Sequence, residues 1–583
     1  MNERWDLTSL YTGFDAPEYG ADMEKAAQTV RSLESFAASL PRQDVAAALE
    51  EALKLEEQLQ QLIFKLGEYA SLRQAANTRD SEAMSAYGRI VALDAASAAP
   101  LAAIRQWIGS LEDLAGLSAQ NPFLHQYAYL LNRIHDDRVH QLPGSGEEIV
   151  AKLSQSDAWA DMHQQLTSTV AVHYRGTTTN LSAIRNMAYS EDAQVRKDAY
   201  EAELACYDAI KDPVAFALNS IKLKTITMAQ LRGYESPLAM TLHHSDLRRE
   251  TLDAMFAAMD EYLPKFWQYL RAKGKLLGHE NGLPWYDLFA PVGRSSRTFT
   301  TQQARDYLVD LFARFDKEES DMIAQAFDSA WIDFFPRDGK AGGAFCENVP
   351  CLGESRILTN FDGQMGDVVT LAHELGHAFH NHNIRAHRPL NQDYSMPVAE
   401  TASTFNECVV MASAIGDAAD DAEKLALIES QLSDATQVIC DIYSRFRFEA
   451  EVFQRREQEF LNADTLCDIM LRAQKASYGD GLDQNVLHPY MWVCKSHYYG
   501  PTFYNFPYAF GALFARGLYA QYEKEGASFV PKYKKMLYTT TVASTEDTAK
   551  VAGIDLTDKN FWRSALEIIA EQIDLFCDLA EKQ

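Results

Sequence analysis

Apolar residues are spaced as in helices over most of the chain, and one short stretch near the middle breaks the pattern. From residue 21 to about residue 117, apolar positions recur three and four apart and Gly and Pro are scarce. This spacing predicts long amphipathic helices. Clear examples are Leu53, Leu55, Leu59 and Leu62.

A second segment of helical character covers about residues 146–224. Within it, Ser190 precedes Glu191 and Asp192. This order is typical of an N-cap residue followed by an acidic first helical turn. We therefore expect Ser190 to cap a helix, and the first third of the chain to be nearly all α-helical.

The composition changes over about residues 333–366, where Gly and Pro accompany short apolar runs such as Ile357-Leu358. This change predicts short strands and turns. Asp367 is the expected N-cap of a helix over about 367–383, and Ser395 that of a helix over about 396–415 with Pro397 in its first turn. The pattern as a whole predicts a mainly α protein with a small β element before two helices.

The length of the chain argues against a single core. Cores stop growing near roughly 250 to 300 residues, and the chain has 583, so we expect two lobes or several subdomains. We place a helical lobe at residues 1–185 and the catalytic region at residues 186–583. No internal repeat or low-complexity linker is evident.

The charge balance narrows the range of partners. With 82 acidic and 54 basic residues, the formal net charge of −28 would repel both nucleic acid and anionic lipid. The first residues lack the basic start and apolar core of a signal peptide. The apolar run from Phe506 to Leu518 contains Arg516 and is shorter than the roughly 20 residues that a bilayer requires. Eight scattered cysteines do not form a disulfide framework, so we expect a soluble cytoplasmic protein.

The run His373-Glu374-Leu375-Gly376-His377 is the strongest chemical signal in the sequence. Two histidines four apart on a helix are separated by about 40° and about 6 Å, so both imidazoles can reach one metal ion. The adjacent Glu374 can take a proton from a water bound to that metal. Apolar residues on the same predicted helix provide the buried setting that this motif requires. The alternative is a core helix whose histidines are satisfied by other partners.

A catalytic zinc takes three protein ligands, so a third donor is needed. The metzincin pattern fails, because it requires glycine at position 380 and histidine at position 383, where the chain has His380 and Asn383. We assign Glu400, on the following helix, as the third ligand of one zinc ion. Ser403 and Glu407 share its predicted face and could orient a ligand, although Glu407 could equally be a solvated helix residue.

Three other possible ligand sets are less convincing. His380 could compete as a ligand, and the helix turns His382 away from the pair, so we interpret both as bystanders. Cys346 and Cys351 have no partner ligands nearby in the sequence, so buried or loop thiols are the simpler interpretation.

An aromatic stretch from Tyr490 to Phe510 surrounds the turn signal Gly500-Pro501. Such density is typical of a core, but a phenol or imidazole beside the metal could bind the oxyanion formed when a peptide carbonyl is attacked. The polar aromatic residues concerned are His497, Tyr498, Tyr499, Tyr504 and Tyr508.

Several of these segments resemble the oligoendopeptidase F and thimet oligopeptidase family of zinc peptidases, most closely its bacterial oligoendopeptidase F branch. The resemblance covers nearly the whole chain. The segments that carry it are Trp5-Asp6-Leu7 through Leu10-Tyr11, Arg232-Gly233-Tyr234 with Ser236, Pro336-Arg337-Asp338-Gly339-Lys340, the helix ending His373-Glu374-Leu375-Gly376-His377-Ala378-Phe379-His380, and Glu400 with Ser403.

The resemblance implies a two-lobed helical ellipsoid with a deep central channel that admits only short unstructured peptides. In it, His373, His377 and Glu400 match the zinc ligands and Glu374 the base. His497, Tyr504 and Tyr508 look like the substrate and oxyanion residues, although the segment around Gly500 differs in length from the thimet branch. The region Gly342, Gly343, Ala344, Phe345 and Cys346 looks like the strand that pairs with substrate backbone.

We therefore expect a zinc metallo-oligopeptidase that cuts internal bonds of short peptides, with Glu374 as general base. A carboxypeptidase or dipeptidase on the same zinc site is one alternative, and end-blocked peptides would separate it. A non-catalytic peptide-binding scaffold is another, against which the intact Glu374 argues. Cleavage specificity, preferred length and oligomeric state are not encoded in any pattern of the sequence.

Overall fold

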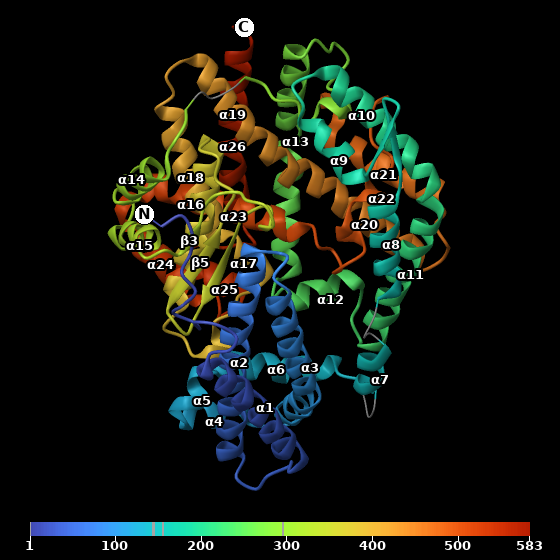
Figure 1. Ribbon diagram of the computed structural model, residues 1–583. Helices are drawn as coiled ribbons and strands as arrows, with labels where there is room; N and C mark the ends of the chain where they lie inside the picture. Colours follow the sequence, from blue (N-terminus) through green and yellow to red (C-terminus); the bar gives the residue numbers. More distant parts are fainter. Residues whose placement is uncertain (1, 143–145, 154–156, 294–296, 583) are drawn as a thin grey trace. The chain divides into compact units, whose positions relative to one another are not determined.

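Helices account for most of the structure, a computed structural model that describes residues 2–142, 146–153, 157–293 and 297–582 (Figure 1). The chain forms two compact units, each assembled from three separate segments. Unit 1 contains residues 1–141, 297–410 and 522–553, and unit 2 contains residues 142–296, 411–521 and 554–583. The mainly α prediction is confirmed.

Unit 1 begins with three long helices, α1, α2 and α3, that pack side by side (Figure 1). Asp44 and Asp80 cap α2 and α3 through their side chains, and the predicted apolar positions Leu53, Leu59 and Leu62 are buried. The elements of unit 1 are α1 (Pro17–Ala38), α2 (Val45–Ala76), α3 (Ser81–Gly109), α4 (Leu114–Gln120), α5 (Pro122–Gln126), α6 (Ala128–Asp137), η1 (Arg138–His140), α14 (Thr301–Phe312), α15 (Lys317–Asp328), β3 (Ile332–Asp333), β4 (Phe345–Val349), β5 (Glu354–Leu358), α16 (Met365–Ile384), η5 (Pro389–Asn391), α17 (Met396–Ala399), η9 (Gly526–Ser528), α24 (Val530–Thr539) and α25 (Thr545–Val551).

A three-stranded sheet in the order β3-β5-β4 lies against α16, so the small β element is confirmed next to the histidine helix. β3 and β5 are parallel, whereas β4 and β5 are antiparallel with Phe345 opposite Leu358. The segment before β4 is anchored by Asp333, whose Oδ1 lies 2.6 Å from Arg337 Nη1 and 2.7 Å from the fully buried Lys340 Nζ. β4 is therefore an edge strand whose entry is fixed by buried ion pairs.

Unit 2 is built around α13 and α26, which lie side by side (Figure 1). Its elements are α7 (Gly146–Leu153), α8 (Ala158–Thr169), β1 (Val172–Tyr174), β2 (Thr177–Thr179), α9 (Leu181–Asn186), η2 (Met187–Tyr189), α10 (Ala193–Cys206), η3 (Tyr207–Ala209), α11 (Lys211–Leu231), α12 (Pro237–His244), α13 (Arg249–Leu276), η4 (Trp285–Asp287), α19 (Asp421–Thr436), η6 (Gln437–Asp441), α20 (Ile442–Arg456), α21 (Ala463–Tyr478), η7 (Gly479–Gly481), α22 (Met491–Cys494), η8 (Ser496–Tyr498) and α26 (Lys559–Ala580). The unit boundaries fall within α18 (Thr401–Gly416) and α23 (Phe506–Glu525).

Two local expectations in unit 2 were wrong. The N-cap of α10 is Asp192, whose carboxylate accepts the backbone N–H groups of Gln194 and Val195, while Ser190 lies one turn earlier and accepts the Asp192 N–H. The helical stretch is also interrupted by the hairpin β1–β2. Its turn places Arg175 at φ 46° and Gly176 at φ 79°, the left-handed conformations that a two-residue hairpin turn requires.

The predicted division at residue 185, the two-lobed shape and the central channel stay predictions. Within the described ranges, every helix is too short or too polar to cross a membrane.

Candidate metal centre

The helix α16 carries the histidine pair and starts two residues before the predicted N-cap. Gln364 is its N-cap and Asp367 is the third residue of a capping box, so the expectation for Asp367 was wrong. The Asp367 carboxylate accepts the backbone N–H groups of Gln364 and Asp362, each at 2.9 Å. Its acidic group still satisfies donors at the helix start, from inside the first turn.

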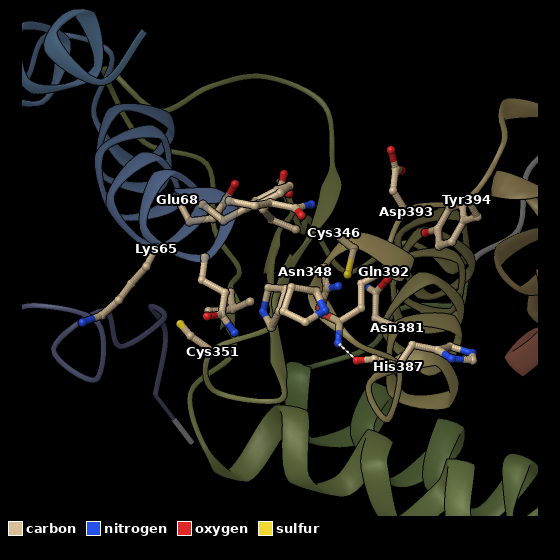
Figure 2. A pocket seen from close by; sticks show the side chains of 17 residues that line it. Lys65, Glu68, Cys346, Asn348, Cys351, Asn381, His387, Gln392, Asp393 and Tyr394 are labelled. Atoms are coloured by element: carbon tan, nitrogen blue, oxygen red, sulfur yellow. Dashed lines mark hydrogen bonds between the residues drawn. The ribbon is translucent and has the colours of Figure 1, made fainter. Parts of the chain in front are cut away.

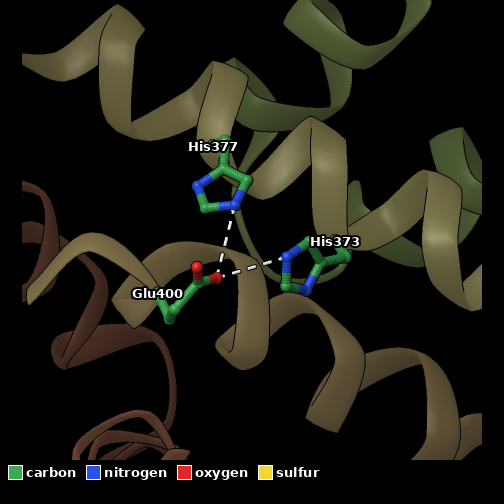
Figure 3. A group of neighbouring side chains, drawn as sticks. All are labelled: His373, His377 and Glu400. Atoms are coloured by element: carbon green, nitrogen blue, oxygen red, sulfur yellow. Dashed lines mark ion pairs between the residues drawn. The ribbon is translucent and has the colours of Figure 1, made fainter. Parts of the chain in front are cut away.

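His373 and His377 lie one helical turn apart with their ring centroids separated by 4.9 Å. Both side chains are mostly buried, with 24% and 16% of their surface exposed. Their Nε2 atoms converge on a single oxygen, Glu400 Oε2, at 3.2 Å and 3.3 Å (Figure 3). Ligating atoms of the three residues all lie within 4.8 Å of one another, the one such group among the residues that the structure describes.

Glu400 lies at a break in the chain and not within a continuous helix as predicted. α17 ends at Ala399, α18 begins at Thr401, and Glu400 has φ −88° and ψ 9° between them. Ser403 Oγ donates to Glu400 Oε2 at 2.8 Å and to the Glu400 carbonyl oxygen at 3.1 Å. Ser403 therefore orients the carboxylate from the first turn of α18.

The crossing of α16 and α18 depends on Gly376, a residue to which the sequence patterns gave no role. A Cβ at this position would stand 2.5 Å from the Ala402 carbonyl oxygen and 2.6 Å from Ser403 Cα. No side chain fits, so glycine permits the approach that brings Glu400 to the histidines. A glycine at an interior helix position is the one sequence signal of this contact.

A second set of contacts ties α18 to the other side of the histidine pair. His373 Nδ1 lies 2.6 Å from Glu407 Oε1, and Asn406 donates to the Ala372 carbonyl oxygen at 3.2 Å. When Nδ1–H donates to Glu407, the Nε2 lone pair of neutral His373 faces Glu400 and is available to a metal. Burial would lower the pKa of His373, but its hydrogen bonds to Glu400 and Glu407 raise it to about 10.

Glu374 is 5% exposed and points away from Glu400's face of the helix by one position. Burial raises the pKa of Glu374, while the charges of His373 and His377 act in the opposite direction. Burial, and then the charge of Glu374, raise the pKa of the Cys346 thiol on β4. The edge strand and the carboxylate of Glu374 are thus electrostatically close.

The neighbouring histidines of α16 have other partners. His380 is fully buried, stacks on Tyr394 with centroids 4.2 Å apart, and lies 2.8 Å from Thr540 Oγ1. Burial lowers the pKa of His380 to about 3. His382 Nε2 lies 2.8 Å from Glu318 Oε1. Both contacts agree with their interpretation as bystanders.

A cavity of about 380 Å³ lies between α2, β4 with its following turn, and residues 387–394 (Figure 2). Glu68 and Glu347 both line it. Burial and the charge of Glu347 raise the pKa of Glu68 to about 9, and burial raises the pKa of Glu347 to about 6. Cys346 and Cys351 also line it as free thiols. The sequence gave no sign of this cavity, because it joins segments about 280 residues apart along the chain.

The segment predicted to pair with substrate lies mostly before the strand. Phe345 and Cys346 are in β4, whereas Gly342, Gly343 and Ala344 form an irregular approach to it. Asn360 Nδ2 holds this approach by donating to the carbonyl oxygens of Ala341 and Gly343, at 3.1 Å and 2.8 Å.

His497, Tyr504 and Tyr508 gather within unit 2. The His497 ring lies 5.7 Å from that of Tyr504 and 5.8 Å from that of Tyr508, and the two tyrosine rings are 5.4 Å apart. Burial lowers the pKa of His497 to about 4, and the positive charges of Arg445 and Lys495 act in the same direction. This imidazole is therefore neutral near pH 7.

Two other members of the aromatic stretch are core residues. Tyr498 is 1% exposed, and Tyr499 stacks on His163 with centroids 3.6 Å apart and donates to the Trp492 carbonyl oxygen at 2.8 Å. The stretch therefore contains both core residues and the separate cluster of His497, Tyr504 and Tyr508.

The matched proteins share this fold and extend over the whole chain. Oligopeptidase PepF of Bacillus subtilis is 23% identical over 593 aligned residues, which cover 100% of this chain and 88% of the relative. A Chlamydophila abortus structure described as a peptidase has a TM-score of 0.87 at 20% identity, covering 99% of this chain and 98% of that one. Oligoendopeptidase F from Enterococcus faecium has a TM-score of 0.74 at 18% identity, covering 97% and 99%.

A mainly helical chain that gathers two histidines and a glutamate in this way has the features of a metallopeptidase. The model of peptidase family M3 matches residues 186–568, more than half of the sequence. The chain belongs to peptidase family M3. The relatives and structures that bear the oligoendopeptidase F name confirm the resemblance to that branch.

Proposed function

We propose that the protein is a zinc-dependent endopeptidase that hydrolyses internal bonds of short oligopeptides. The observation that carries this proposal is the convergence of His373 Nε2 and His377 Nε2 on Glu400 Oε2, with Glu374 next to the first histidine. Two imidazole nitrogens and one carboxylate are a ligand set of catalytic zinc sites, which keep a further position open. Glu407 at His373 Nδ1 and Ser403 at Glu400 supply the supporting hydrogen bonds that such ligands usually have.

Each residue then has a defined task. Zinc, when held by His373, His377 and Glu400, supplies a Lewis acid that polarises a peptide carbonyl and makes water more acidic. Glu374 accepts the proton of the attacking water and returns it to the nitrogen of the departing amine. The reaction thus needs Glu374 as a carboxylate and then as an acid.

The remaining assignments concern substrate binding. The edge strand β4, entered through Gly342 to Ala344, offers free backbone groups for pairing with an extended peptide. Neutral His497, with Tyr504 or Tyr508, supplies hydrogen bonds to the oxyanion, a contribution on the order of 3 kcal/mol. A cytoplasmic location follows from the sequence features alone, and cell fractionation tests it.

The decisive variant is Glu374→Gln. It keeps the side-chain shape but cannot accept the proton, so we expect zinc content to stay at one ion per chain while cleavage of a quenched peptide falls by several orders of magnitude. Glu571→Gln, at an exposed position of α26, is the matched control and keeps full activity. Near-normal turnover by Glu374→Gln would rule out the proposed mechanism.

Peptides blocked at both ends distinguish the endopeptidase from an exopeptidase on the same centre. An endopeptidase cuts them internally, and mass spectrometry identifies the products. An enzyme that needs a free terminus leaves them intact. A non-catalytic scaffold would show neither stoichiometric zinc nor chelator-sensitive hydrolysis.

A further inference from the structure

The loop that carries Tyr504 contains a backbone conformation that has to be held in place. Phe503 has φ 51°, in the left-handed region that costs a non-glycine residue about 1–2 kcal/mol. The residue is 2% exposed, and its neighbour Tyr504 lies in the cluster with His497 and Tyr508. The direction of the Tyr504 side chain depends on keeping this conformation.

A single carboxylate grips the loop on both sides of Tyr504. Glu449 of α20 accepts the Phe503 backbone N–H at Oε1, at 3.1 Å, and the Asn505 side-chain amide at Oε2, at 2.7 Å. Asn505 Oδ1 in turn accepts the Phe506 backbone N–H at 2.6 Å, where α23 begins. Glu449 and Asn505 are 0% and 1% exposed.

The charge of Glu449 is maintained by a buried lysine. Lys222 Nζ of α11 lies 2.6 Å from Glu449 Oε1, and the two side chains are 1% and 0% exposed. Lys222 Nζ also lies 4.9 Å from the centre of the Phe453 ring. Without this cation, an ionised carboxylate at so buried a position would be strongly destabilised. The pair therefore allows a charged acceptor inside the core of unit 2, and charged acceptors bind N–H donors more strongly than neutral ones do.

We infer that Glu449, kept ionised by Lys222, is a positioning residue that fixes the 503–505 backbone and thereby the orientation of Tyr504 toward the reaction. Glu449 acts through the loop and not on the substrate. This inference rests on the proposed function to the extent that Tyr504 assists catalysis.

A second buried pair in the same unit provides a matched control. Lys273 Nζ lies 2.6 Å from Glu429 Oε1, with 1% and 8% exposure. Its further contacts are with the Leu288 carbonyl oxygen and the Tyr269 hydroxyl. Glu429→Gln thus damages an equivalent ion pair whose partners lie outside the 503–505 loop.

The experiment compares Glu449→Gln with Glu429→Gln in the full-length zinc-loaded protein. Hydrogen–deuterium exchange followed by mass spectrometry reports the Phe503 and Phe506 amides directly. We expect their exchange to quicken in Glu449→Gln and to stay unchanged in Glu429→Gln. We also expect kcat to fall roughly 10- to 100-fold in Glu449→Gln with KM within about threefold, because the misplacement affects the reacting geometry.

The double variant Lys222→Met, Glu449→Gln separates positioning from stability. It removes both charges, so the melting temperature should recover toward that of the unchanged protein while loop exchange stays fast and kcat stays low. Recovery of kcat together with the melting temperature would overturn the inference. If Glu449→Gln folds poorly, Asn505→Ala loosens one side of the grip and leaves the ion pair intact.

Failure of the inference is distinguishable from failure of the proposed function. Unchanged exchange at Phe503 and Phe506 in Glu449→Gln overturns the inference, and so does fast exchange with an unchanged kcat. Glu374→Gln, assayed in parallel, tests the proposed function, and the exchange measurement does not depend on its result.

Discussion

Gly376 of α16 and Ser403 of α18 lie so close that a Cβ on the glycine would stand 2.6 Å from Ser403 Cα. Real Cβ atoms do not approach other carbons this closely, so the two helices meet backbone to backbone. Because Ser403 donates to Glu400 Oε2, this contact also sets the distance between Glu400 and the histidines.

Gly376→Ala should force the two helices apart and weaken metal binding. Overpacking of this kind typically costs about 1–3 kcal/mol, so the melting temperature should fall. We expect zinc affinity to drop by roughly tenfold, since the carboxylate moves away from the imidazoles. Competition with a chromophoric chelator measures it.

Gly366→Ala is the control for that variant. A Cβ there would meet no described heavy atom within 4 Å, so alanine should leave zinc affinity unchanged and favour the helix slightly. Equal zinc affinities for the two variants would contradict the role given to the Gly376 contact.

Glu407→Gln should weaken zinc binding without touching a ligand. The amide keeps the size of the side chain but removes the charge at 2.6 Å from His373 Nδ1. Loss of such supporting partners costs roughly 10- to 100-fold in metal affinity. The same chelator titration tests this expectation, with the exposed Glu571→Gln as control. An affinity equal to that of the control would return Glu407 to the solvated role considered from the sequence.

Glu68→Gln should stabilise the protein more at pH 8 than at pH 5. The folded pKa of Glu68, about 9, lies above its ordinary value of 4.5, so the folded state binds more protons between these values. Stability is therefore lost as pH rises through this window, and glutamine removes that loss. We expect a gain on the order of 1–2 kcal/mol at pH 8, seen as a higher melting temperature. A gain that does not depend on pH would contradict the burial of this carboxyl beside Glu347.

The sequence predicted those features that depend on local spacing. The spacing of His373 and His377 on one helix, the β element before that helix and the mainly α fold all follow from local periodicity, and the structure has them. The exact helix starts did not follow. Asp367 and Ser190 are both good capping residues by type, but Gln364 and Asp192 occupy those positions, because several polar neighbours compete for the same backbone donors.

Features that depend on contacts between distant segments were not predictable from local patterns. The break at Glu400 was hidden because Pro397 and Ser395 suggest one helix, whereas the chain turns again before Thr401. The grip of Glu449 on residues 503–505 and the role of Gly376 are tertiary contacts, and neither leaves a periodic signal. The assembly of each unit from three separate segments has the same cause.

The segmented build of unit 1 has a consequence for synthesis on the ribosome. The histidine helix α16 contacts α24, and His380 meets Thr540, which lies in the last of the three segments of that unit. Long-range contacts of this kind form late and leave apolar surface exposed in the meantime. The nascent chain therefore has to carry α1 to α3 and the future metal helix unfinished until translation has passed residue 553, and a chain that terminates earlier should be a substrate for chaperones or proteases and not a smaller enzyme.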